Sequence, residues 1–165
     1  MDPDSLYIID TSSLVSLHHW RPPSTNRPVW ERLDRLIQDG RLLSPIEVHD
    51  EIRAGQDALS RWVTRRRKTT SLFVRTTGHH VGVVKQIIAR FPEFVEHNRP
   101  VAQADPFVVA LAVVESKKTL GQRCIVVTEE KFSPSGRPRI PHVCESYHLP
   151  YMSIHQMYVA EGWSF

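Results

Sequence analysis

The sequence predicts an α/β fold built around a small, mainly parallel central sheet. Two short segments, residues 6–9 and 123–128, carry apolar residues at successive positions, as is typical of strands covered on both faces. Four acidic residues lie just past these strands or near the starts of predicted helices: Asp10, Glu51, Asp105 and Glu130. In an open α/β sheet, ligands bind outside the carboxyl ends of the strands, so we expect these four to converge there.

The first strand, residues 6–9, is followed by Asp10 and by a predicted short helix around residues 14–20. Two prolines mark residues 21–26 as a loop, because proline fixes the chain and donates no hydrogen bond. The next predicted helix, residues 28–39, has one apolar stripe and ends at Gly40.

Residues 42–43 are predicted to form a short strand. Ser44, Pro45 and Glu47 then match a helix start, with Ser44 as the cap, Pro45 in the first position and Glu47 completing a capping box. This arrangement gives Glu47 a structural role. Glu51, one turn further along the same helix, has no such role and is the better candidate ligand.

The second half of the chain alternates helices with short strands. Helices are predicted over residues 57–68, 81–90 and 141–147 and from residue 155, strands over 123–128 and 151–154, and a basic, turn-rich loop over 131–139. Asp105 and Pro106 open the most apolar helix, which is therefore expected to be buried. Taken alone, Asp105 reads as an ordinary N-cap, and its role as a ligand depends on the other three acids.

With 165 residues, we expect one domain, residues 1–165. The formal net charge is +3, but residues 1–60 hold ten acids and six bases, whereas residues 61–165 hold eight acids and fifteen bases. A basic half beside an acidic site suits a polyanion that must also meet a metal ion. A solvated charged surface explains the charge distribution equally well.

Residues 61–75 contain six bases and no acid, interleaved with Trp62 and Phe73. Such a stretch can grip phosphates and stack a base, or it can be a solvated helix end. The candidate nucleic-acid-binding residues are Arg65, Arg66, Arg67 and Lys68 in this stretch and Lys131, Arg137 and Arg139 in the later loop.

The cellular setting is expected to be the cytoplasm. Cys124 and Cys144 have no zinc-site spacing and are predicted to be buried, reduced thiols. No apolar run approaches the ~20 residues of a membrane span, and the opening residues 1–4 lack the basic start of a signal peptide. No membrane partner is expected.

The order of these segments and acids resembles the PIN domain, a VapC-like family of nucleases. Asp10-Thr11-Ser12 after the first strand is similar to the opening motif of the family, and Glu51 stands at its second acid. Residues 104–112 resemble the helix that supplies the third acid, and Thr128-Glu129-Glu130 stands where the family shows Thr-x-Asp. The segment 131–137 and the ending 161–165 look like an uncharacterised PIN-like subfamily associated with bacterial toxin–antitoxin loci.

This resemblance implies a three-layer α/β/α fold and a Mg²⁺- or Mn²⁺-dependent ribonuclease that acts as the toxin of a type II toxin–antitoxin system. Asp10, Glu51, Asp105 and Glu130 would be both catalytic and metal-binding, with one or two ions, and Thr11, Ser12 or Thr128 would orient a water or a phosphate oxygen. RNA is the implied substrate, a cognate antitoxin is the implied partner, and a homodimer is compatible with the family. Three alternatives stay open: Glu129 as the fourth acid, a DNA nuclease, and a non-catalytic module that binds nucleic acid or protein.

Overall fold

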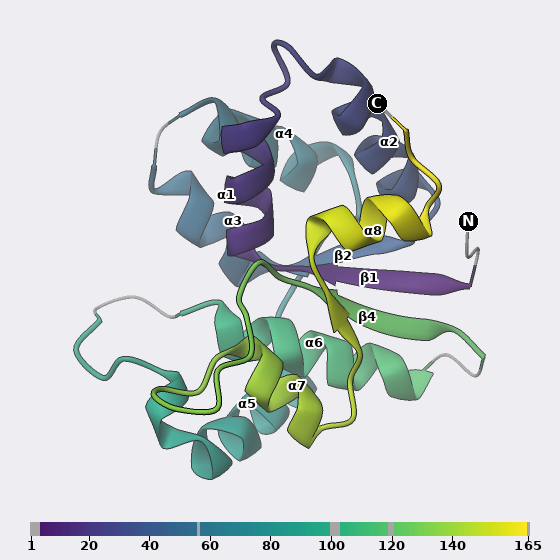
Figure 1. Cartoon of the computed structure of the whole chain (residues 1–165). Coiled ribbons are helices and arrows are strands. Elements are labelled where there is room, and N and C mark those ends of the chain that lie inside the picture. Colours follow the sequence, from purple (N-terminus) through teal and green to yellow (C-terminus); the bar gives the residue numbers. More distant parts are fainter. Residues whose placement is uncertain (1–3, 56, 100–102, 119–120, 165) are drawn as a thin grey trace.

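The computed structural model describes residues 4–55, 57–99, 103–118 and 121–164 (Figure 1). In this part of the chain five parallel strands form one sheet in the order β3-β2-β1-β4-β5. The strands are β1 (Ser5–Ile9), β2 (Leu42–Pro45), β3 (Phe73–Val74), β4 (Arg123–Val127) and β5 (Tyr151–Met152). The central strand β1 is buried along its whole length, which explains its continuous apolar sequence.

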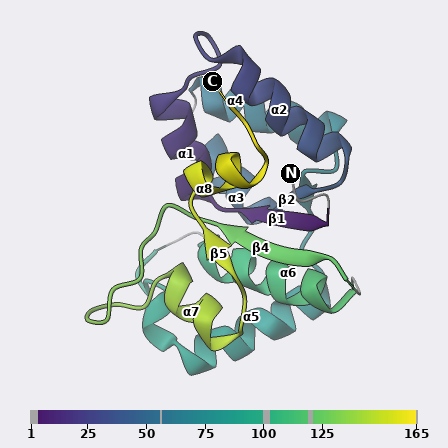
Figure 2. The ribbon, with the colours of Figure 1, turned by 45° about the vertical axis from the view of Figure 1, so that its right-hand side comes forward.

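Helices cover both faces of the sheet, so the predicted three-layer α/β/α fold is confirmed (Figures 1 and 2). One face carries α1 (Thr11–Trp20), α2 (Arg27–Gln38), α3 (Ile46–Arg53), α4 (Ala58–Thr69) and α8 (Ile154–Ala160). The other carries α5 (Gly78–Arg90), α6 (Asp105–Lys118) and α7 (Ile140–Ser146), and a short 3₁₀ helix, η1 (Pro92–Phe94), follows α5.

The chain leaves the two central strands toward opposite faces of the sheet. β1 is followed by α1 on one face, and its neighbour β4 leads to α7 on the other (Figure 2). Connections that diverge in this way leave a crevice at the carboxyl ends of the two strands, which is the usual ligand site of open α/β sheets. Asp10 and Thr128 are the residues that directly follow β1 and β4.

The predicted capping box at Ser44, Pro45 and Glu47 is wrong. Ser44 and Pro45 belong to β2 and pair with Phe73 and Val74 of β3, a two-residue strand that the sequence analysis did not predict. The Ser44 hydroxyl donates to the backbone oxygen of Ile9 over 2.8 Å, and Glu47 instead accepts a hydrogen bond from Thr76. Pairing between strands therefore outweighed the local helix-start signal.

Two helices begin earlier than predicted because a side chain caps each of them. Asp10 accepts from the backbone nitrogen of Ser13, so α1 begins at Thr11, and Thr77 caps α5, which begins at Gly78. Residues 92–94, for which the sequence analysis predicted no helix, form η1.

The core contains the helix that the sequence marks as most apolar. Every residue of α6 from Val108 to Val114 is buried against the sheet and α5. Cys124 and Cys144 are buried free thiols, as predicted. No helix among the described residues has the length and apolar character needed to cross a bilayer. The opening residues 1–3 and Phe165, which entered the sequence analysis, lie outside the described residues.

A buried ion pair fastens the end of the chain to the sheet. Glu161 follows α8 and is 5% exposed, and its carboxylate accepts two hydrogen bonds from Arg41, at 3.1 and 2.5 Å. The hydroxyl of Tyr7 in β1 donates to the same carboxylate over 2.8 Å. Because both charges are largely removed from water, the pair is costly to break from one side.

The substitution Glu161→Gln should therefore lower the free energy of unfolding by about 3 kcal/mol, since it leaves the Arg41 charge uncompensated. The matched control is Glu31→Gln, which breaks the exposed pair with Arg27 and should change stability by less than about 0.5 kcal/mol. Urea unfolding of both variants measures the difference. Equal effects would show that the buried pair does not anchor the C-terminal segment.

Candidate active site

Asp10 stands at the centre of the crevice and is 1% exposed. One carboxylate oxygen accepts the backbone N–H of Ser13 at 2.8 Å, and the other accepts the hydroxyls of Ser12 at 2.7 Å and Thr128 at 2.6 Å. Burial raises the pKa of Asp10 to about 6, although these hydrogen bonds favour the ionised form and oppose the rise. The carboxylate is thus fixed in orientation, and it ionises at a higher pH than an exposed aspartate.

Glu51 reaches the crevice from α3. Its carboxylate accepts the hydroxyl of Thr11 at 2.8 Å and the backbone N–H of Ala104 at 2.7 Å. The second bond holds the residue just before Asp105, so Glu51 positions the start of α6 as well as contributing its own charge. The auxiliary role suggested for Thr11 is consistent with this contact.

Asp105 is the first residue of α6. Burial raises its pKa to about 7, and the charges of Glu130, Asp10 and Glu51 add to the rise, while Arg137 opposes it. Among the described residues no hydrogen bond to its carboxylate is present, so nothing supports reading Asp105 as an ordinary N-cap. Its electrostatic neighbours show that the four predicted acids share one site.

The two adjacent glutamates point to different helices. Glu129 accepts the backbone N–H of Ile154, the first residue of α8, and Glu130 accepts that of Ile140, the first residue of α7, each at 2.8 Å. Carboxylates at helix starts are favourable because of the unpaired N–H groups there. Of these two glutamates, Glu130 is the one whose charge raises the pKa of Asp105. Glu130 and Asp105 also line one cavity, which is described below.

The acids are close enough to interact, but they are held apart by their own hydrogen bonds. In the described part of the chain, no three side chains of the His, Cys, Asp and Glu types come together closely enough to hold a metal ion as they stand. The donor set is nonetheless the right one for Mg²⁺ or Mn²⁺, because carboxylate and hydroxyl oxygens surround the crevice. Asp105 also lies near other negative charges, and a bound cation would reduce the repulsion between them.

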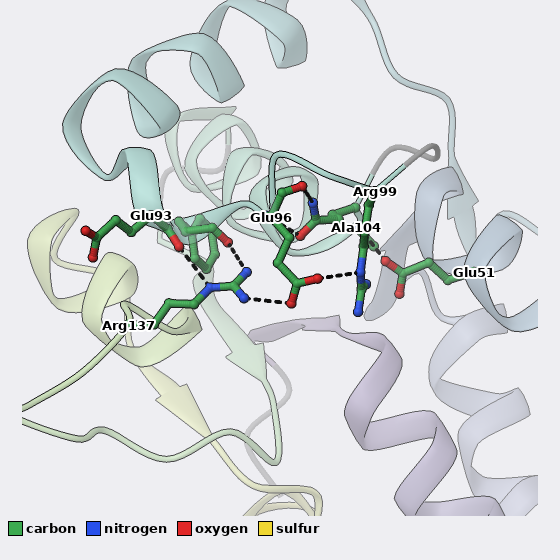
Figure 3. A network of polar contacts seen from close by, with 8 residues as sticks. Glu51, Glu93, Glu96, Arg99, Ala104 and Arg137 are labelled. Atoms are coloured by element: carbon green, nitrogen blue, oxygen red, sulfur yellow. Dashed lines mark hydrogen bonds and ion pairs between the residues drawn. The ribbon is translucent and has the colours of Figure 1, made fainter.

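A cavity of about 470 Å³ opens beside Asp105 and Glu130. Arg99, Arg137 and Arg139 line the same cavity. Figure 3 shows how two of these arginines are held: Glu96 accepts from Arg137 at 2.7 Å and pairs with Arg99 at 2.8 Å. One cavity thus carries both acidic and basic groups.

The residues that follow α5 and the residue that precedes α6 are held in place by groups that belong to the site. Arg137 donates to the backbone oxygens of Glu93 and Phe94, at 2.9 and 3.2 Å, and Glu51 holds Ala104 at the other end of the loop (Figure 3). The guanidinium of Arg137 therefore has a structural role in addition to the positive charge that it brings to the cavity. Sequence reasoning missed Glu96 and Arg99, whose only signal was their place in the loop just before Asp105.

The remaining basic candidates divide into groups. Arg66 is bound by Asp34 through two hydrogen bonds, at 2.9 and 2.6 Å, and lies over the ring of Trp62, so its guanidinium is occupied. Arg65, Arg67 and Lys68 are exposed on α4, and Lys131 and Arg139 are exposed in the later loop. Only Arg137 and Arg139 of the seven line the cavity beside the acids.

The raised pKa of Asp105 gives a stability prediction for the metal-free protein. Below about pH 4 the carboxyl is protonated in both the folded and unfolded chain; as the pH rises toward 7 the unfolded chain ionises first, so stability falls. Asp105→Asn should flatten this fall and raise the free energy of unfolding at pH 8 by about 1–3 kcal/mol. The exposed Asp39→Asn is the control. Unfolding in EDTA across this pH range tests it, and an unchanged profile contradicts it.

Comparisons with known proteins give a family and a fold for this chain. The family model that matches residues 7–165 is described as a domain of unknown function (DUF4411). No curated protein sequence matches the chain.

Among solved structures, the chain is similar to one in VapBC-1 from nontypeable Haemophilus influenzae, with 14% identity, a TM-score of 0.56, and coverage of 90% of this chain and 97% of that one. It is also similar to a chain of VapBC2 from Rickettsia felis, which was solved bound to a DNA fragment from the promoter, with 10% identity, a TM-score of 0.51, and coverage of 90% and 98%. At these identities the likeness concerns the fold. The chain has a VapC-like PIN fold and belongs to the DUF4411 family.

Proposed function

We propose that the protein is a metal-dependent endoribonuclease and the toxin of a type II toxin–antitoxin system. The observation that carries the proposal is the group formed by the buried Asp10 and the half-buried Glu51, Asp105 and Glu130 near the carboxyl ends of β1 and β4, where the pKa of Asp105 rises to about 7. Perturbed carboxylates gathered in a crevice are typical of catalytic sites.

The four carboxylates would hold one or two Mg²⁺ or Mn²⁺ ions, directly or through water. Bound there, a divalent cation supplies Lewis acidity that makes water a better nucleophile at neutral pH and offsets charge on a phosphodiester. Because the pKa of Asp105 is about 7 without a cation, its carboxyl is partly protonated at neutral pH, and binding of the ion should release protons from it.

The protein's own groups would orient the reaction. Ser12 and Thr128 fix the Asp10 carboxylate from two sides, and Thr11 fixes Glu51. The Ser12 and Thr128 hydroxyl oxygens lie 3.4 Å apart, and the backbone N–H groups of Glu129 and Glu130 donate to them, which ties the loop after β4 to the site. Such support is what keeps ligating carboxylates in a productive orientation.

The basic side of the cavity supports a nucleic-acid substrate. Arg99, Arg137 and Arg139 line the same cavity as Asp105 and Glu130, so a polyanion could lie with one phosphate at the acidic cluster and a neighbouring phosphate at the arginines. RNA, rather than DNA, is what the resemblance to PIN nucleases implies. Phosphate contacts alone do not separate the two sugars.

The partner side of the proposal rests on the solved relatives, both of which are VapBC structures. A cognate antitoxin protein is the proposed partner, and a homodimer is the proposed assembly of the single domain.

Asp10→Asn tests the proposed activity. The amide is nearly isosteric but lacks the charge for a cation, so Mg²⁺-dependent RNA cleavage should fall by at least about 100-fold with the fold retained. The matched control is Asp57→Asn, because Asp57 also caps a helix, α4, by accepting from the backbone nitrogen three residues on, at 2.8 Å. Cleavage of a panel of structured RNAs is the measurement. Activity equal in both variants would favour the non-catalytic binding module.

The two glutamates after β4 provide a second test. Glu130→Gln should lower turnover by about 10-fold or more and raise the Mg²⁺ requirement, because it removes the charge nearest Asp105. Glu129→Gln keeps an oxygen for Ile154 and should act mildly. Reversed effects would assign the fourth acid to Glu129, and equal small effects would leave the site with three working acids.

A further inference from the structure

Glu96 binds two arginines of the cavity that also contains Asp105 and Glu130. One oxygen of its carboxylate, Oε1, accepts from Nη1 of Arg137 at 2.7 Å, and the other, Oε2, pairs with Nε of Arg99 at 2.8 Å (Figure 3). All five residues line one cavity. Hydrogen bonding from Arg137 and the positive charge of Arg99 lower the pKa of Glu96, so its carboxylate is ionised at neutral pH.

The two ion pairs of Glu96 are open to solvent. The side chains of Glu96, Arg99 and Arg137 are 45%, 55% and 43% exposed. Ion pairs of this kind contribute little to stability, because water and salt screen the charges. Another anion with the same charge and a similar arrangement of oxygens can therefore replace the carboxylate at small cost.

Arg137 does not depend on Glu96 for its position. Its Nε and Nη2 donate to the backbone oxygens of Glu93 and Phe94, at 2.9 and 3.2 Å. The backbone of Glu96 is fixed separately, since the side chain of Gln103 accepts its N–H at 3.1 Å and donates to its oxygen at 2.8 Å. The carboxylate can therefore leave while the arginine and the backbone around it stay in place.

A phosphodiester resembles this carboxylate in the features that the arginines bind. It carries one negative charge and two unesterified oxygens on one atom, and arginine binds carboxylate and phosphate through the same N–H groups. We propose that Glu96 is an internal competitor of the substrate: in the free protein its carboxylate fills the subsite where Arg99 and Arg137 bind a backbone phosphate of RNA. The inference rests on the proposed function, because it takes RNA as the substrate.

The competing carboxylate determines which anions the cavity accepts. Because Glu96 is tethered beside the arginines, it competes at a high effective concentration, and a free phosphate or a mononucleotide displaces it poorly. An extended strand makes contacts beyond this subsite, for example with Arg139 of the same cavity, and so displaces the carboxylate more readily. Glu96 thus favours extended RNA over small phosphates.

Binding in EDTA tests this competition without any cleavage. The probe is a 5′-labelled single-stranded RNA, and its binding is measured by fluorescence anisotropy over a range of salt. Glu96→Gln keeps the size of the side chain and removes its charge, so it should tighten RNA binding by about 3–10-fold and steepen the salt dependence by about 0.7. The matched control is Glu93→Gln, which removes the same charge from the same segment. The carboxylate of Glu93 points away from Arg137 (Figure 3), so this variant should have a smaller effect.

Two further variants separate contact from charge. Glu96→Asp keeps the charge but shortens the side chain, which weakens its hold on the two arginines, so it should still tighten RNA binding by about 2-fold. Adding Arg99→Gln to Glu96→Gln should remove most of the gain, because the gain acts through the arginines that Glu96 releases. Arg99 is chosen because the guanidinium of Arg137 also holds backbone oxygens. Thermal melting verifies that each variant is folded.

Equal gains in Glu96→Gln and Glu93→Gln would overturn the competition in favour of a general charge effect. Weaker RNA binding by folded Glu96→Gln would make the carboxylate a structural part of the loop, and a gain that persists with Arg99→Gln would show that it does not act through the arginines; both results overturn the inference. RNA cleavage by the wild-type protein in Mg²⁺, without any gain in Glu96→Gln, would contradict the competition and leave the proposed function standing. Tighter binding by Glu96→Gln without cleavage of any RNA by the wild-type protein would support the subsite and contradict the proposed function.

Discussion

The buried carboxylate of Asp10 is the group on which the rest of the site depends. Through one side chain it joins the end of β1, the start of α1 and the end of β4, because its partners are Ser12, Ser13 and Thr128. The strands β1 and β4 are neighbours in the sheet, and the chain leaves them toward opposite faces. An acid placed at this junction cannot move without moving both layers of helices, which gives the site a rigid reference point.

The cost of this arrangement is electrostatic. Burial raises the pKa of Asp10 to about 6, and burial together with the charges of Glu130, Asp10 and Glu51 raises that of Asp105 to about 7, so the ionised cluster works against folding. Hydrogen bonds from hydroxyl groups and from backbone N–H groups at helix starts stabilise the carboxylates of the cluster. Arg99, Arg137 and Arg139 line the cavity beside Asp105 and Glu130, and the charge of Arg137 offsets part of the rise in the pKa of Asp105.

Helix α3 contributes to the acidic site and to a second cavity. Glu51 fixes Ala104 and the start of α6, whereas His49 and Arg53 line a cavity of about 350 Å³. The basic residues of α4 also point in different directions. Arg66 binds Asp34 of α2, whereas Arg67 and Lys68 line this second cavity together with His49 and Arg53 of α3. A run of like charges in sequence thus separates into a structural contact and cations that line a cavity.

The sequence by itself determined the layered α/β architecture, the positions of β1 and β4, the buried helix α6 and the three acids that gather around Asp105. These features are local or periodic: apolar residues at successive positions mark buried strands, and acids after strands of a parallel sheet meet at one edge. Only the tertiary structure decided that Ser44 and Pro45 extend β2, because their pairing partners in β3 lie almost thirty residues away. It alone separated Glu129 from Glu130 and Arg66 from Arg67, since neighbours in sequence point to different elements and only packing chooses which one each side chain meets.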